Sequence, residues 1–316
     1  MILMLESETV RIGRGVGIGS LLMIGLLAVP WCLGAEGVTT PDELVARHLD
    51  SIGTPQVRQA AKSRVAEGTA EFRILVGGSG RLDGKSALVS EGRKLHFMMK
   101  FPNGDYHGER FVSDGSRVQI FTATQQARSI FGEFLRGQDV EIREGLLGGV
   151  LSTAWPLLHL EDHKAKLSLA GLKSVDGQQL YEVQYRPKKS VDLQMDLYFD
   201  PTTFRHVKSV YWVTVRPSIV NVPGGPESAV PTGGEGVALP SGNSETASAR
   251  QHESHYRVEE RFSEFSTVDG LTLPSHYNLR FTQELQNGQT TSWEWDIKET
   301  QISNNVSLDP RNFEVK

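Results

Sequence analysis

The sequence predicts a mainly β, α+β protein in which an antiparallel sheet is covered on its apolar face by a few helices. Three observations predict this class: period-two alternation of apolar and polar residues in several segments, Asp-Gly and Asn-Gly pairs between them, and one leucine- and glycine-rich interruption. Antiparallel strands with one covered face and one solvated face show this alternation. The chain has 316 residues, of which 38% are hydrophobic, so it can bury a sizeable core.

The N-terminal residues 1–35 have the organisation of a secretory signal peptide. Arg11 and Arg14 precede the apolar stretch SLLMIGLLAV, and the small residues Gly34 and Ala35 follow it. The apolar stretch is short for a membrane-spanning helix. We therefore expect cleavage at these small residues and a periplasmic product, with an uncleaved N-terminal membrane anchor as the alternative.

Cysteine content and charge exclude several classes of site and partner. Cys32 is the only cysteine, and Trp31 beside it argues against a lipid anchor at this position. The mature chain therefore holds no disulfide and no thiolate metal site. A net charge of -5 gives no support for nucleic-acid binding, which needs a basic face. We expect no cofactor and no nucleic-acid partner.

Residues 36–316 are predicted to form a single domain that begins with a helix. Thr40 suits the N-cap, Pro41 the first helical position and Glu43 the capping box, and Gly53 ends the pattern. The apolar face of this helix carries Leu44, Val45, Leu49 and Ile52. A second short helix is expected over residues 55–63.

Strands follow from about residue 64. The segments RKLHFMMKF, DLQMDLYFD and TSWEWDIKE alternate strictly, and the residues that they place on one face are Leu95, Phe97, Met99, Phe101, Leu193, Met195, Leu197, Phe199, Trp293, Trp295 and Ile297. Asp-Gly and Asn-Gly pairs tolerate positive φ and indicate hairpin turns. These pairs are Asp83-Gly84, Asn103-Gly104, Asp114-Gly115, Asp176-Gly177, Asp269-Gly270 and Asn287-Gly288.

Residues 128–159 interrupt the alternation with helical patterns. One short amphipathic helix is expected around Ile130, Phe131, Phe134 and Leu135. A second helix is expected from the spacing of Leu146, Leu147, Val150, Leu151, Trp155 and Leu158. Helices inserted between strands most simply cover the apolar face of the sheet.

Residues 217–251 are rich in Pro, Gly and Ser and hold no aromatic residue. Such a segment buries too little apolar surface to offset the entropy of ordering. We predict a disordered loop that expands one hairpin, because strands of similar character lie on both sides; a boundary between two domains is the alternative.

The sequence holds no strong catalytic or metal-binding motif. His159 and His163 are four residues apart, but solvated histidines at a helix end explain this spacing better than a metal site. The segment HESH, starting at His252, has the wrong spacing for a zincin, and the chain lacks a G-x-S-x-G elbow. We therefore expect a non-catalytic protein without a metal.

Large and pliable side chains on the covered face suggest a ligand space. The candidate cavity-lining residues are Phe97, Met99, Phe101, Met195, Phe199, Trp293 and Trp295. Methionine adapts to varied apolar partners, and a large curved sheet capped by few helices can leave part of its face unfilled. A plain, filled core is the alternative for each of these residues.

Several stretches, in order, resemble the outer-membrane lipoprotein-sorting, or Lol carrier-like, superfamily. They are DELVARHLDSIG, SRVAEGTAEF, LYFDPTTFRHVKSVYW, FSTVDGLTLPSHYNLRF and IKETQISNNVSLDPRNFEV. The resemblance covers about residues 41–316 and implies a strongly curved antiparallel half-barrel with helices closing its mouth. It also implies a carrier of lipoprotein acyl chains or of another hydrophobic or lipid ligand. The alternatives are an envelope interaction or stress-sensing module of the same fold, with an envelope protein partner, and an envelope hydrolase.

Overall fold

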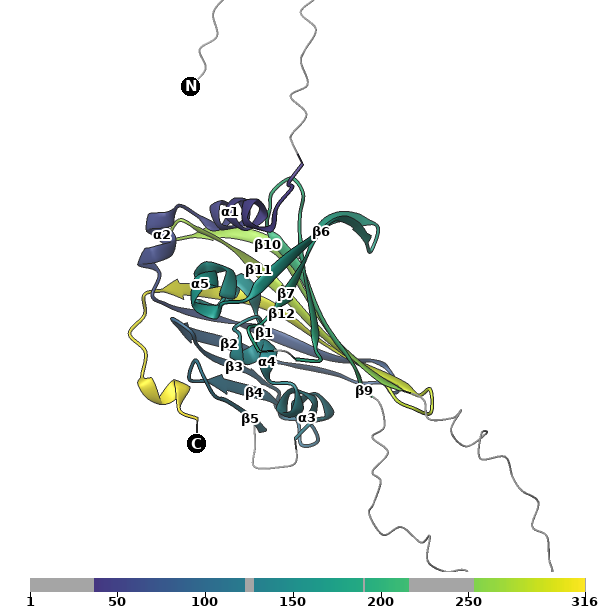
Figure 1. The fold of residues 1–316 in the computed structure, drawn as a ribbon. Coiled ribbons are helices and arrows are strands. Elements are labelled where there is room, and N and C mark those ends of the chain that lie inside the picture. Colours follow the sequence, from purple (N-terminus) through teal and green to yellow (C-terminus); the bar gives the residue numbers. More distant parts are fainter. Residues whose placement is uncertain (1–36, 123–127, 190, 216–252, 316) are drawn as a thin grey trace, which may run out of the picture. The chain divides into compact units, whose positions relative to one another are not determined.

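A computed structural model describes residues 37–122, 128–189, 191–215 and 253–315, which are drawn as coloured ribbon in Figure 1. The predicted signal peptide, residues 1–35, and the predicted loop insertion, residues 217–251, lie outside the described residues. The helices are α1 (Pro41–Ile52), α2 (Pro55–Ala60), α3 (Ile130–Gly137), α4 (Val140–Arg143), α5 (Leu160–His163) and the 3₁₀ turns η1 (Gly149–Leu151), η2 (Pro156–His159) and η3 (Pro310–Phe313).

The strands form one antiparallel sheet. They are β1 (Ser63–Val76), β2 (Arg81–Glu91), β3 (Lys94–Lys100), β4 (Gly108–Ser113), β5 (Val118–Thr122), β6 (Lys166–Val175), β7 (Gln178–Arg186), β8 (Gln194–Phe199), β9 (His206–Val215), β10 (Ser254–Val268), β11 (Leu271–Glu284) and β12 (Thr290–Asn304). The 12 strands lie in the order β5-β4-β3-β2-β1-β12-β11-β10-β9-β8-β7-β6. Two meanders therefore meet where β1 pairs with β12, and the sheet remains open at β5 and β6. The predicted fold class, a curved antiparallel half-barrel with few helices, is confirmed.

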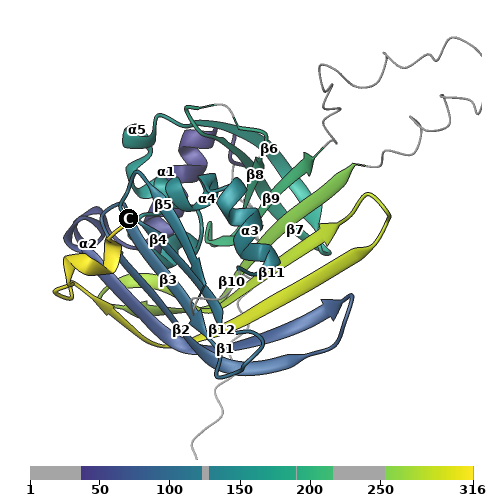
Figure 2. The ribbon, with the colours of Figure 1, turned by 90° about the horizontal axis from the view of Figure 1, so that it is seen from below.

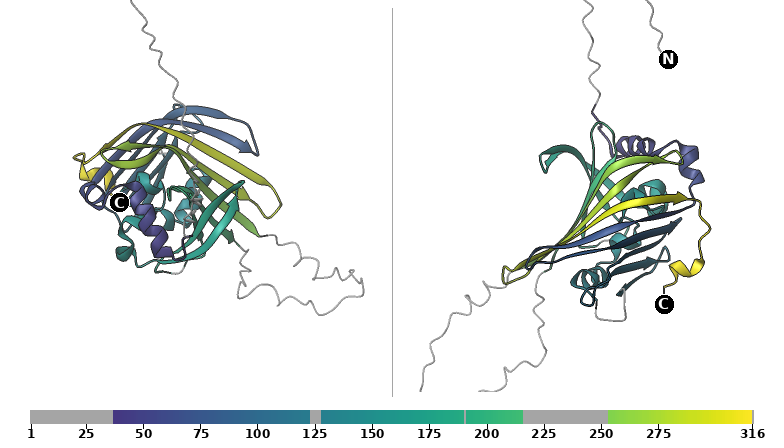
Figure 3. Two further views of the ribbon diagram at one scale, coloured as in Figure 1. Left: turned by 90° about the horizontal axis from the view of Figure 1, so that it is seen from above. Right: turned by 180° about the vertical axis from the view of Figure 1, so that it is seen from behind.

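The sheet curves around the helices. Figure 2 shows α1, α3 and α4 inside the curve formed by the strands, and the two views of Figure 3 show the same arrangement from above and from behind. The main hydrophobic core lies between the concave face and these helices. The convex face is largely polar, with a small apolar cluster of Leu180, Tyr198 and Val210.

The first helix forms as its caps predict. The Thr40 side chain accepts a hydrogen bond from the Glu43 backbone N–H at 3.2 Å, and the Gly53 N–H closes the last turn on the Leu49 carbonyl. The second helix is shorter than expected, because it ends at Ala60 and β1 already begins at Ser63.

Five of the six Asp-Gly and Asn-Gly pairs lie between strands, and one does not. Asp176-Gly177 and Asp269-Gly270 connect β6 to β7 and β10 to β11, with positive φ at both positions of each pair. The Asp83-Gly84 turn is wrong, because this pair lies within β2. A Cβ atom at Gly84 would lie 2.3 Å from the Lys100 carbonyl oxygen. Glycine is needed there for close packing of the backbone against β3, and not for a turn.

The pairings of β10 and β11 place two segments that the sequence singles out, Pro274 and residues 217–251. Pro274 lies in β11, where the pairing with β12 begins only at His276, so its missing N–H falls at a local edge. Ser254 of β10 pairs with Val215 of β9, so residues 217–251 connect two hydrogen-bonded neighbours in the sheet.

The expected second helix of the interruption does not form as one helix. Residues 140–163 instead fold as α4, η1, η2 and α5, separated by turns. Gly145, Gly148 and Gly149 have positive φ, and Pro156 starts η2, so no continuous helix passes through this stretch. Its apolar residues are nevertheless buried in the core, apart from the partly buried Leu158 and Leu160.

Candidate functional site

The interior of the half-barrel contains a continuous chain of aromatic rings. Starting from Phe199, successive ring contacts with centroids 4.8–6.1 Å apart run through His206, Phe262, Tyr277, Phe97, Phe111, Phe131 and Phe281 to Trp293. Trp295 joins this chain at Phe131, 4.9 Å away. These rings come from both meanders and from α3, so one apolar region extends across the whole curve.

The structure places the candidate cavity-lining residues in this region. Phe97, Met99, Phe101, Met195, Phe199 and Trp295 are buried, and Trp293 is partly buried at the edge of the same core. Their side chains pack against other side chains of the core. A ligand that reached them would have to displace part of the packing.

The element that fills the interior is the stretch from α3 to α5, residues 129–163, which we call the cover segment. The sheet holds its middle part through a buried carboxyl group. Glu260 on β10 accepts hydrogen bonds from the Gly148 backbone N–H at 2.7 Å and from the hydroxyls of Tyr211 and Tyr277, each at 2.6 Å. Burial raises the pKa of Glu260 to about 7, although all three donors favour the charged form.

Further polar contacts hold the cover segment in place. Arg64 of β1 donates to the Val150 carbonyl oxygen, and Ser90 of β2 accepts from the Thr153 backbone N–H at 2.9 Å. Another contact joins His48 of α1 to Trp155 of the segment. Each group is buried, so each contact replaces water that the interior excludes.

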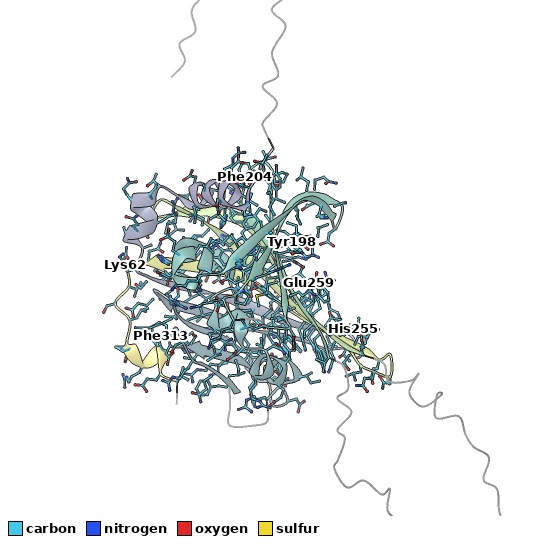
Figure 4. The ribbon with its side chains drawn as sticks, in the orientation of Figure 1. Lys62, Tyr198, Phe204, His255, Glu259 and Phe313 are labelled. Atoms are coloured by element: carbon cyan, nitrogen blue, oxygen red, sulfur yellow. The ribbon has the colours of Figure 1, made fainter. Side chains whose placement is uncertain are left out.

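His48 of α1 links the cover segment to the β8–β9 turn. Its Nε2 accepts from Trp155 Nε1–H at 3.1 Å, so Nδ1 carries the proton and donates to the Phe204 carbonyl oxygen at 3.0 Å. Figure 4 labels Phe204 beside α1. Burial lowers the pKa of His48 to about 4, which keeps the ring neutral and preserves this tautomer.

The start of the cover segment lies over a second buried carboxyl group. Glu109 of β4 accepts from the Tyr106 hydroxyl at 2.9 Å, and that hydroxyl accepts from Trp295 Nε1–H at 2.8 Å. Burial raises the pKa of Glu109 to about 7. Glu141 of α4 is also buried, and its carboxyl oxygens have no hydrogen-bond partner among the described residues. The interior therefore contains carboxyl groups whose raised pKa favours the protonated form.

The outer face carries a hydrogen-bonded chain of a different kind. Ser263 on β10 lies 3.1 Å from His276 Nδ1 on β11, and His276 Nε2 lies 2.9 Å from Asp296 Oδ2 on β12. All three residues line an open groove of about 720 Å³ on the convex face. A similar pair in the core, Ser209 and His206 at 3.0 Å, is fully buried.

The histidine pair considered from the sequence does not come together as a metal site. His163 Nδ1 lies 3.1 Å from Glu144 Oε2, whereas His159 is exposed in η2. Within the described ranges, no group of three or more His, Cys, Asp or Glu side chains has an arrangement that could hold a metal ion. None of the helices in these ranges has the length and apolar character needed to cross a membrane.

Sequence reasoning placed the apolar residues on the covered face of the sheet but missed the polar groups that hold the cover segment. Glu260 lies between Val258 and Phe262, which share its face of β10, so the alternation itself signals a carboxyl group that points into the core. Ser90 and Arg64 give no such signal, because their role depends on where the cover segment crosses the sheet.

Comparison with known proteins gives likenesses in structure only. No family model matches the chain, and the comparison with curated proteins found no match. Among solved structures, the LolA superfamily protein NE2245 from Nitrosomonas europaea is 12% identical with a TM-score of 0.43, over 88% of this chain and 99% of that one. A putative outer membrane lipoprotein-sorting protein domain from Vibrio parahaemolyticus is 11% identical with a TM-score of 0.40, over 85% of this chain and 97% of that one.

A third structure, the MucA/MucB complex of Pseudomonas aeruginosa, is 11% identical with a TM-score of 0.21, over 84% of this chain and 100% of that one. The first two structures bear the name of the superfamily that the sequence motifs resemble, and at this identity membership of the chain in that superfamily stays a prediction. The description of the site rests on the contacts given above.

Proposed function

We propose that the protein is a periplasmic, non-catalytic carrier whose half-barrel takes up a hydrophobic ligand, such as the acyl chains of a lipoprotein or another lipid. The observation that carries this proposal is the continuous aromatic interior beneath the cover segment. Lifting that segment exposes a long apolar surface, and acyl chains are the ligands that bury such a surface most favourably.

The way in which the cover segment is held supports an opening movement. Glycines with positive φ divide the segment into short pieces, and a few hydrogen bonds join its middle part to the sheet. A ligand that displaces the segment must replace apolar contacts of similar area, so opening and binding are coupled.

A reversible cross-link between the cover segment and the sheet tests the carrier proposal. The Thr153 backbone N–H donates to the Ser90 hydroxyl at 2.9 Å, so these two positions are close, and S90C/T153C in a C32S background places the only two cysteines of the variant there for oxidation to a disulfide. We expect the oxidised protein to lose binding of a fluorescent fatty-acyl probe and the reduced protein to regain it. C32S alone and the S90C single variant are the controls. Equal binding in the oxidised and reduced forms would contradict the proposal.

A second candidate function is favoured by the outer-face chain of Ser263, His276 and Asp296. An imidazole that accepts from a serine hydroxyl on one nitrogen and is held by a carboxylate on the other is the arrangement used for nucleophilic acyl transfer. Glu264, next to the serine, has a positive φ of 54°, a strained conformation of the kind found at active sites. This candidate is an envelope hydrolase acting on esters.

A fluorophosphonate reagent separates the two candidates. A hydrolase should give one covalent adduct on Ser263, lost in S263A and slowed at least about 100-fold in H276Q, with S266A as the matched control on the same strand. A carrier without hydrolase activity should give no adduct above that of S263A. The regulatory alternative predicts neither probe binding nor an adduct, and a stable complex with an envelope protein instead.

A further inference from the structure

A cleft of about 590 Å³ opens between the end of the cover segment and the connection from β7 to β8. Lys164 lies on one side of it, directly after α5, and Arg186 and Lys188 lie on the other. Figure 1 shows α5 next to the start of β6. The cleft thus lies where the cover segment rejoins the sheet.

The rim of this cleft is basic. Lys164, Lys166, Arg186 and Lys188 line it, and Asp196 is the only carboxylate among its lining residues. Within the part of the chain that the structure describes, none of these four cations forms an ion pair, and Arg186 donates only to the Gln184 side chain at 3.2 Å. This local excess of positive charge contrasts with the net charge of the whole chain, which is -5.

The floor of the cleft is apolar and continuous with the interior. Tyr185, Leu193 and Met195 line the cleft, are buried, and belong to the same core as Phe97 and Trp295. An extended chain that entered between the basic side chains would therefore meet the apolar core at Leu193 and Met195.

We propose that this cleft binds the anionic head of an amphiphile, a phosphate or carboxylate group, while its acyl chain passes Met195 into the half-barrel. Unpaired lysine and arginine side chains attract such a head, and their flexible stems let the charges converge on it. The inference rests on the proposed carrier function and names the class of ligand, an anionic amphiphile.

The test compares probes of equal chain length with different heads. The probes are a fluorescent lysophosphatidic acid, its fatty acid and the matching uncharged monoglyceride, titrated into the wild type and into K166Q/R186Q/K188Q. One basic side chain near an anionic lipid head contributes a factor of about 5 in affinity. We expect both anionic probes to bind at least about 10-fold more tightly than the monoglyceride, and the triple variant to lose about 100-fold for them alone. K85Q/K100Q/K173Q, which removes cations outside the cleft, should bind like the wild type.

The outcomes distinguish this inference from the carrier proposal. Equal affinity for all three probes, unchanged in the triple variant, would overturn the anionic-head site and leave the carrier standing. Failure of every probe to bind would overturn both. Inorganic phosphate at the probe's concentration should not displace the lysophosphatidic acid; displacement would show a site for free anions and overturn the amphiphile assignment.

Discussion

The clearest quantitative prediction concerns Glu260, whose carboxyl group is fully buried beneath the cover segment. Its pKa is raised from 4.5 to about 7 in the folded protein, mainly by burial. The folded state therefore keeps a proton that the unfolded state releases between about pH 4.5 and pH 7. As the pH rises through this window, the free energy of unfolding therefore falls by about 1.4 kcal/mol per pH unit, or about 3 kcal/mol in total.

Replacing Glu260 with glutamine removes this titration and keeps a similar shape. Urea unfolding of the wild type and E260Q between pH 4.5 and 8 measures the effect. We expect the difference in unfolding free energy between the two proteins to change by about 3 kcal/mol across the window, with the wild type relatively more stable at the acidic end. E161Q, which changes an exposed carboxylate on α5, should follow the wild type. Parallel curves for the wild type and E260Q would refute the reasoning.

Three further outcomes follow from the structure and a fourth from the sequence. F97A should lower the free energy of unfolding by about 3–5 kcal/mol, because the ring is fully buried; urea melts check this, and a cost below about 1 kcal/mol would show a loosely filled interior. G84A should cost about 1–3 kcal/mol, since its Cβ would meet the Lys100 carbonyl oxygen and the Phe101 ring; an unchanged melt would contradict the close approach. Replacing residues 217–251 with a Gly-Ser turn should leave thermal unfolding cooperative, because β9 and β10 pair directly, and a lost transition would assign the segment to the core. N-terminal sequencing of the exported protein should begin near Gly34 or Ala35, and an intact Met1 would reveal an anchor instead.

The sheet could be predicted from the sequence because its strands carry a local signal. Alternation placed Phe97, Met99 and Met195 on the covered face, and the structure buries all three. The first helix was equally local, since Thr40 and Gly53 cap it as their residue types require. Asp83-Gly84 misled for a physical reason: glycine serves close packing as well as turns, and only the neighbouring strand distinguishes the two.

The candidate sites needed strand register, which a single sequence does not provide. Ser263 and His276 are cross-strand partners, and Asp296 comes from a third strand, so their meeting depends on two pairings at once. The basic cleft likewise combines the end of α5 with the β7–β8 connection. The cover segment was predicted to lie on the apolar face, but its division into short turns depends on backbone conformations at glycine that propensity alone leaves open.

The central claim is that the interior of the half-barrel carries a ligand. Native mass spectrometry of the full protein purified from its own envelope tests it most directly, with the S90C/T153C variant in the C32S background, isolated in the oxidised form, as the control. The account predicts that the wild type carries an additional mass, released on denaturation and identified as an acyl-chain compound with an anionic head, and that the cross-linked variant lacks it. A wild type that carries no additional mass and binds no fatty-acyl probe would contradict the account.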